Sequence, residues 1–236
     1  MKRLILGIAT AITFAVAGTV HAESAIFDAK VNGAPASDFG GSTLEVSSTG
    51  TSMIDFSSMD PGGEYVITMA GAYTIKSDAR EFTGFINLLN TTDSNKTFNI
   101  KLALPVFNQL TNAVIDGKIT LTQAINNSGD KITVPANQSG AVVSSDATSV
   151  WSWLTSNDSI GGGAPGAQVS VEKTIPMTAV GTMEVLYGTT YSFNVPSYNI
   201  LTIKLTKFKV GQGAMLSGNK RSSTPPAAKS PPNGAL

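Results

Sequence analysis

Apolar and polar residues alternate along much of this chain, and the alternation predicts where its strands lie. In the clearest stretch, 97–104, every second residue from Phe98 to Leu104 is a large apolar one. The same pattern recurs at 182–187, 190–195 and 201–206. Because successive side chains of a β-strand point to opposite faces, a period of two predicts half-buried antiparallel strands.

Shorter strands and one irregularity follow from the same pattern. After Leu205 the next apolar residues are Phe208 and Val210, a shift of three positions. An extra residue near Thr206 and Lys207 would restore the face, so we expect a β-bulge there. Further strands are expected at 44–46, 65–69, 75, 85–89, 118–122, 132–134 and 169–171.

Turn residues and two helix-like segments complete the pattern. Residues 106–114 and 149–154 have spacings that suit one or two short helices. Glycine, proline and asparagine predict turns at 61–63, 116–117, 127–129 and 161–163.

The expected fold class is therefore all-β. We predict a single antiparallel β-sandwich of roughly eight to ten strands over residues 23–213, with jelly-roll or immunoglobulin-like topology and one or two short helices. From residue 214 to 236 proline, serine and basic residues replace the periodic apolar ones. Such a segment cannot bury enough surface to offset its chain entropy, which predicts a disordered tail.

The first 22 residues predict export. Lys2 and Arg3 precede an apolar run from 4 to 20, and Val20 and Ala22 form a small-x-small cleavage site. This is the pattern of a signal peptide, and the run is short for the alternative, a transmembrane anchor. We expect a secreted, extracellular or cell-surface protein that is not inserted in the membrane after cleavage.

The amino-acid composition limits which kinds of catalytic and metal-binding site the chain can form. The chain has no cysteine, and its one histidine, His21, lies in the predicted signal peptide, so catalytic triads, thiol chemistry and ordinary zinc sites are excluded. A net charge of zero argues against a nucleic-acid partner. We predict no enzyme, no cofactor and no metal. The remaining enzymatic alternative is a carboxylate-dependent hydrolase. Calcium binding by acidic residues in turns also stays open as an alternative. The acids considered are Asp55, Asp60, Glu64, Asp158 and Glu184.

Two other features have a functional and a structural interpretation. Trp151 and Trp153 would share one face of a strand. They could form a platform on which a sugar stacks, or they could belong to the core or to a subunit contact. We favour the core or a subunit contact. Five N-x-[ST] motifs are interpreted as solvated turns. They begin at Asn90, Asn95, Asn126, Asn137 and Asn157.

Short motifs resemble a known family. Residues 25–28 (AIFD), 39–46 (FGGSTLEV) and 59–63 (MDPGG), with the final strand 199–208, resemble the TasA/camelysin family of secreted biofilm-fibre proteins. In its signal sequence, size and polar β-sandwich character, the chain is also similar to cysteine-free chaperone–usher pilins.

Both resemblances imply a fibre subunit assembled by donor-strand complementation, in a fimbrium or biofilm matrix. Its partners would be copies of itself, with an export chaperone or accessory matrix protein as a further candidate. Residues 24–31 suit the donor strand, through Ile26 or through Phe27, Ala29 and Val31, with residues 32–35 and 40–41 as a flexible hinge. Alternatively, the same residues form the first strand of their own sandwich. The alternative function is a monomeric carbohydrate-binding or adhesin module.

Overall fold

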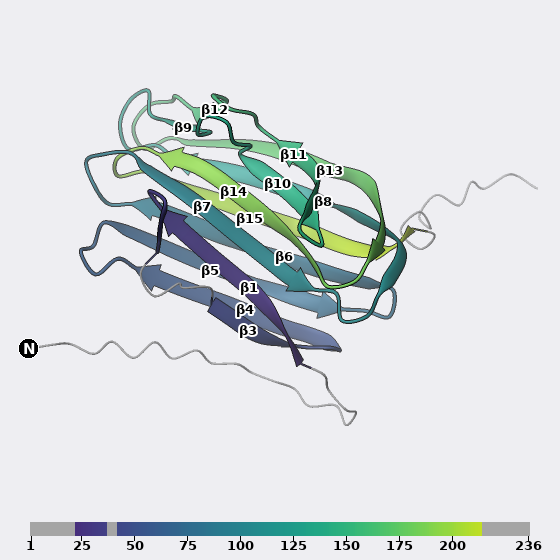
Figure 1. Ribbon diagram of the computed structural model, residues 1–236. Helices are drawn as coiled ribbons and strands as arrows, with labels where there is room; N and C mark the ends of the chain where they lie inside the picture. Colours follow the sequence, from purple (N-terminus) through teal and green to yellow (C-terminus); the bar gives the residue numbers. More distant parts are fainter. Residues whose placement is uncertain (1–21, 37–41, 214–236) are drawn as a thin grey trace, which may run out of the picture.

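The computed structural model describes residues 22–36 and 42–213, and these residues form two antiparallel β-sheets packed as a sandwich (Figure 1). The predicted tail, 214–236, and all of the predicted signal peptide except Ala22 lie outside the described residues. Within the described ranges, no helix has the length and apolar character needed to cross a membrane.

Sheet A contains the first strand of the chain. Its strands follow the order β11–β10–β14–β7–β1, with β2 and β3 on the other edge of β1, β9 beside β14, and β12 beside β9. The strands are β1 (Ala22–Val31), β2 (Ala34–Pro35), β3 (Ser42–Ser47), β7 (Lys96–Pro105), β9 (Lys131–Thr133), β10 (Ala141–Ser145), β11 (Thr148–Trp153), β12 (Ser159–Gly161) and β14 (Leu186–Val195).

Sheet B contains the last strand and has the order β13–β8–β15–β6–β5–β4. Its strands are β4 (Gly50–Met59), β5 (Tyr65–Ile75), β6 (Ala79–Asn90), β8 (Leu110–Ala124), β13 (Gln168–Met183) and β15 (Ile200–Gln212). The described residues thus form fifteen strands, more than the eight to ten expected, because several are too short to show a period.

The strand order is that of a jelly roll. If the short strands β9 and β12 are set aside, the chain from β6 onward crosses between the sheets at every connection except the β10–β11 hairpin. Near its end β14 inserts between β7 and β10, and β15 inserts between β6 and β8. This order selects the jelly roll over the immunoglobulin-like alternative. The strands before β6 extend it: β1 lies on the edge of β7, and β5 on the edge of β6.

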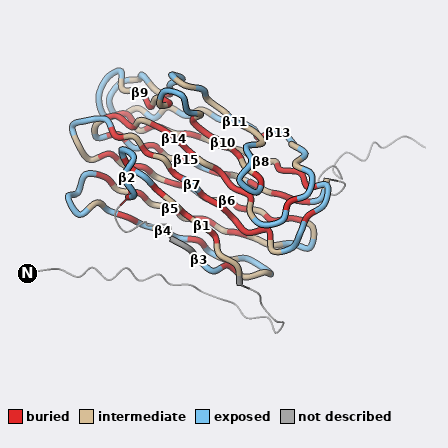
Figure 2. The backbone as a smooth tube through the Cα atoms, viewed as in Figure 1, coloured by how far each residue is buried: buried red, intermediate tan, exposed pale blue. Residues whose placement is uncertain are grey.

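The core follows the predicted alternation. Phe98, Ile100, Leu102 and Leu104 of β7 are all fully buried, as predicted. Figure 2 shows buried positions along the strands and exposed ones gathered in the turns. The bulge in β15 is confirmed, because its pairing with β6 shifts after Leu205. Opposite it, residues 116–117 lie inside β8 and form no turn between strands.

The prediction of one or two short helices was wrong. Residues 149–154 fall largely in strand β11, and β8 begins at Leu110. In β8 both Thr111 and Asn112 are exposed, and Asn112 has φ 51°. This irregularity separates the buried Leu110 and Ala113 by three positions, which imitates the spacing of a helix.

The strand predicted at 182–187 was also wrong. β13 ends at Met183 and β14 begins at Leu186, with Val185 58% exposed between them. The carboxylate of Asp146 accepts hydrogen bonds from the backbone N–H groups of Glu184, Val185 and Leu186, each at 2.9 Å. Burial alone would raise the pKa of Asp146, but these three bonds outweigh burial and lower it. A side chain distant in sequence therefore fixes this turn.

Asn90 corrects the interpretation of the N-x-[ST] motifs as solvated turns. It is fully buried, and its Nδ2 donates to the carbonyl oxygens of Ser94 (2.7 Å), Val195 (3.0 Å) and Pro196 (3.0 Å). It therefore joins the β6–β7 turn to the β14–β15 turn. The other four motif asparagines are exposed.

Candidate functional site

The predicted donor strand is β1, which lies between β7 and β3 (Figure 1). Its residues Ile26–Val31 pair with Ala103–Phe98 of β7, and Ala22–Phe27 pair with Ser47–Ser42 of β3. We call these residues of β7 and β3 the acceptor edges. In this single chain β1 occupies its own acceptor edges, which is the arrangement expected of the first strand of its own sandwich.

The inward face of β1 belongs to the core. Phe27 and Ala29 are fully buried and Val31 is 7% exposed, whereas Ile26 is only half-buried and lies on the opposite face. The Phe27 ring stacks on Phe56 of β4 in the other sheet, with centroids 5.2 Å apart and planes at 17°. Of the two candidate sets, the structure therefore turns Phe27, Ala29 and Val31 inward.

The expected hinge at 32–35 is instead an ordered hairpin. Asn32 and Gly33 have φ 51° and 81°, as in the type I′ turn that Asn-Gly favours, and Val31 pairs with Ala34. Ala36 is buried, and its N–H donates to the carbonyl oxygen of Ala29 at 2.8 Å. Residues 22–36 thus form one unit. The other part of the expected hinge, 40–41, lies outside the described residues.

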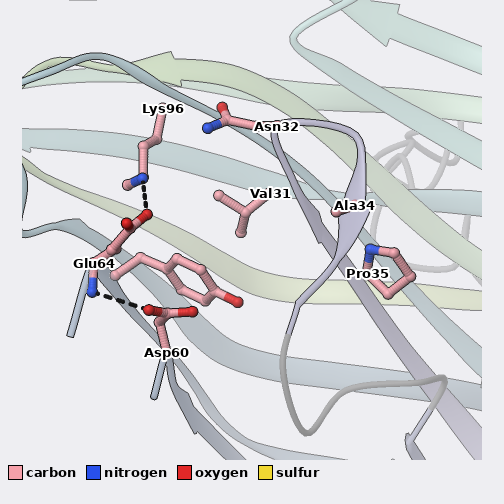
Figure 3. A pocket seen from close by; sticks show the side chains of 8 residues that line it. Val31, Asn32, Ala34, Pro35, Asp60, Glu64 and Lys96 are labelled. Atoms are coloured by element: carbon pink, nitrogen blue, oxygen red, sulfur yellow. Dashed lines mark hydrogen bonds and ion pairs between the residues drawn. The ribbon is translucent and has the colours of Figure 1, made fainter. Parts of the chain in front are cut away.

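A hollow of about 220 Å³ lies between this hairpin and the β4–β5 turn (Figure 3). Lys96 Nζ lies 2.7 Å from Glu64 Oε2, and the Lys96 side chain is only 6% exposed. Asp60 Oδ2 accepts from the backbone N–H of Gly62 at 2.8 Å and of Glu64 at 3.3 Å. Both carboxylates therefore have structural partners: one neutralises a buried ammonium group, and the other holds its own turn.

The structure does not bring the remaining candidate acids to this hollow. Asp55 is exposed in the middle of β4, and Asp158 accepts from the N–H of Thr155 at 2.7 Å. Glu184 accepts from Gln109 Nε2 at 3.0 Å in the turn between β13 and β14. Over the described ranges no three acidic or histidine side chains gather in a way that could hold a metal ion.

The two tryptophans lie on β11 at the outer edge of sheet A. Trp151 and Trp153 are both partly buried and pack against the core, while Ser152 between them is exposed. They share one face, and that face is the inner one.

Sequence reasoning missed the outer face of sheet B. The pairing registers place one residue from each of six strands in a single row, and none of the six is charged. Asn87 Nδ2 donates to Thr68 Oγ1 at 3.2 Å, and Thr202 Oγ1 donates to Asn87 Oδ1 at 2.8 Å. The row consists of Ser57, Thr68, Asn87, Thr202, Thr122 and Ser170.

Apolar residues border this row, which we call the polar row. On one side lies Phe85, which is 41% exposed. The pairing registers place three exposed charged residues in the same row as Phe85, namely Asp55, Lys204 and Glu172. On the other side Met59 is 62% exposed and Ile200 37%. Met59, Val66, Leu89, Ile200 and Ala124 fill consecutive positions across five strands. The polar row and the apolar row that contains Met59 therefore form an uncharged band of hydroxyl, amide and apolar groups, with partners far apart in sequence.

Comparisons with known proteins add little. No protein-family model matches the chain, and no curated protein matches it. Among solved structures, the chain is similar at 11% identity to a chain described as "Structure of infectious bursal disease virus Gx strain", with a TM-score of 0.20. The likeness covers 85% of this chain and 66% of that chain. A TM-score this low supports no conclusion about fold or function.

Proposed function

We propose that this chain is an exported structural subunit of an extracellular fibre, pilus or biofilm matrix. Subunits assemble head-to-tail, each placing its β1 on the acceptor edges of a neighbour. The observation that carries the proposal is that β1, the first described strand, pairs on both edges and also supplies buried core residues. An equivalent strand from a second copy fits the same acceptor edges by the same contacts.

Exchange of β1 between copies has a low energetic cost. Five residues, 37–41, separate the hairpin from β3 along the chain. Exchange of an identical element costs little, because every native contact is remade. Because each subunit gives its strand to one neighbour and receives one from another, the contact does not close on itself and extends into a filament.

A disulfide trap tests this proposal more sharply than deletion of residues 23–33. Deletion would also remove core residues from a monomer, so both arrangements predict damage. Asp28 pairs with Lys101 on the outer face of sheet A. Their Cα atoms are expected about 5.5 Å apart, within disulfide range, and the chain has no other cysteine. The protein to be tested is residues 23–236, the chain left by the predicted cleavage, which we call the mature chain. The D28C/K101C variant of the mature chain is expected to give filaments by electron microscopy and a ladder of covalent oligomers on a non-reducing gel.

The matched control keeps the same acceptor position. Thr190 pairs with Lys101 between β14 and β7, both inside the jelly roll. K101C/T190C is therefore expected to form only intramolecular disulfides, even within filaments. Fully oxidised D28C/K101C that runs as a monomer from filament preparations, or a mature protein that stays monomeric at every concentration, would refute strand exchange.

The uncharged band on sheet B favours a second candidate function, a glycan-binding or adhesin module. Hydroxyl and amide groups beside an exposed ring suit the polar edges and apolar faces of sugars. The probe is a set of insoluble neutral polysaccharides, including cellulose and chitin, in a pull-down assay. If the band binds them, Phe85→Ala should reduce binding at least about tenfold, and Trp153→Ala should not. Absence of binding to every polysaccharide, or equal loss in both variants, contradicts this function.

A further inference from the structure

We propose that Asn32 sets the register of β1 against β7, in whichever copy the strand inserts. The part of this statement that concerns a second copy rests on the proposed function; the part that concerns a single chain does not. The inference identifies a positioning residue just beyond the donor strand.

The contacts of Asn32 join the end of β1 to one residue of β7. Its backbone N–H donates to the carbonyl oxygen of Thr97 at 2.8 Å, and its side-chain Oδ1 accepts from the N–H of Thr97 at 2.9 Å. The amide side chain thus supplies the acceptor that the backbone withdraws as the chain turns away. Both backbone hydrogen-bonding groups of Thr97, its N–H and its carbonyl oxygen, are therefore satisfied by Asn32.

Thr97 is itself held in place by its neighbours. Its Oγ1 donates to Asn194 Oδ1 at 2.7 Å, and Asn194 Nδ2 donates to Thr133 Oγ1 at 3.1 Å. These bonds connect β7, β14 and β9 within sheet A. Asn32 therefore attaches β1 to a fixed point of the jelly roll.

The alternating apolar residues of β1 do not by themselves fix its register against β7. A slip of two residues keeps the same side chains on the core face, because the side-chain period is two. Within the strand, the volume of Phe27 opposes the slip, whereas Ala25 and Ala29 offer little resistance. After a slip that brings Lys30 opposite Lys101, Asn32 lies opposite Asn99, and both bonds to Thr97 are lost.

The backbone conformation at position 32 explains why asparagine suits this position, and it shows which substitutions can test its role. Asn32 has φ 51°, which asparagine, aspartate and glycine tolerate better than other residues. Asn32→Gly keeps the turn but removes the acceptor. Asn32→Asp keeps both the turn and an acceptor oxygen. Comparing these two variants separates the hydrogen bond from the conformation of the turn, and glycine avoids the folding defect that Asn32→Ala risks.

Register is measured by disulfide equilibrium in the monomeric mature chain. The pair D28C/K101C reports the native register, and K30C/K101C reports the slip by two. Each pair is equilibrated in a glutathione buffer, and the disulfide fraction is measured by peptide mass spectrometry. Asn32→Gly is expected to raise the slipped disulfide about three- to tenfold relative to the native one, and Asn32→Asp should leave the ratio near wild type.

Two results would overturn the inference: an unchanged ratio in Asn32→Gly, or a ratio in Asn32→Asp as high as in Asn32→Gly. The first would show that the core alone sets the register, and the second that the side-chain acceptor does not matter. Because the measurement uses the monomer, it stays readable if no filament forms. Failure of the proposed function and failure of this inference are therefore distinguishable.

Discussion

Replacing Phe27 by alanine is expected to cost about 3–5 kcal/mol of the free energy of unfolding. The side chain is fully buried and stacks on Phe56 in the opposite sheet, so its removal leaves a cavity between the two layers. Net stabilities of domains are about 5–15 kcal/mol, so this one change removes a large share. Urea denaturation of the mature protein measures it, as a lower midpoint at unchanged slope.

The control for Phe27 is its neighbour on the same strand. Ile26 points to the outer face of sheet A and is half-buried, so Ile26→Ala should cost about 1 kcal/mol or less. Equal costs for the two variants would contradict the assignment of the Phe27 face to the core. In filaments, Phe27→Ala should also be the variant that releases subunits, if β1 is exchanged.

Gly188→Ala is expected to destabilise the fold by about 3 kcal/mol or more. An added Cβ would lie 2.1 Å from the carbonyl oxygen of Leu102 and 3.0 Å from the Cα of Ala103. Both atoms are backbone of β7, the strand that carries the acceptor edge for β1. Since backbone atoms cannot rotate away, β14 and β7 must separate. Thermal or urea unfolding gives the loss directly.

Gly163 provides the matched control. There an added Cβ meets side-chain atoms only, the nearest being Ile125 Cδ1 at 3.0 Å. Side-chain ends can shift by a few tenths of an ångström, so Gly163→Ala should cost less than about 1 kcal/mol. If Gly188→Ala were as mild as this control, the close approach of β14 to β7 would be refuted.

Strand faces were largely predictable, because alternation is a local signal. The bulge near Thr206 was predictable for the same reason, since one inserted residue shifts the apolar face visibly. The helix over 106–114 failed because a bulge in β8 and a helix both place apolar residues three apart. The strand at 182–187 failed because Asp146, far away in sequence, bends the chain there.

The candidate site was predictable only in part. The sequence pointed to Phe27, Ala29 and Val31 as one possible inward set, and the structure buries them. The sequence indicated Asn32 only as part of a flexible hinge, because the partner of its side chain, Thr97, lies 65 residues away along the chain. The polar row of sheet B was invisible for a similar reason: its members come from six strands that only pairing aligns.

By itself the sequence determined the fold class and which side chains of most strands face inward, because both follow from the order of neighbouring residues. Only the tertiary structure decided the jelly-roll order, the strands that flank β1, and the burial of Asn90. These depend on hydrogen bonds and packing between residues distant along the chain, and a period of two is compatible with many such pairings.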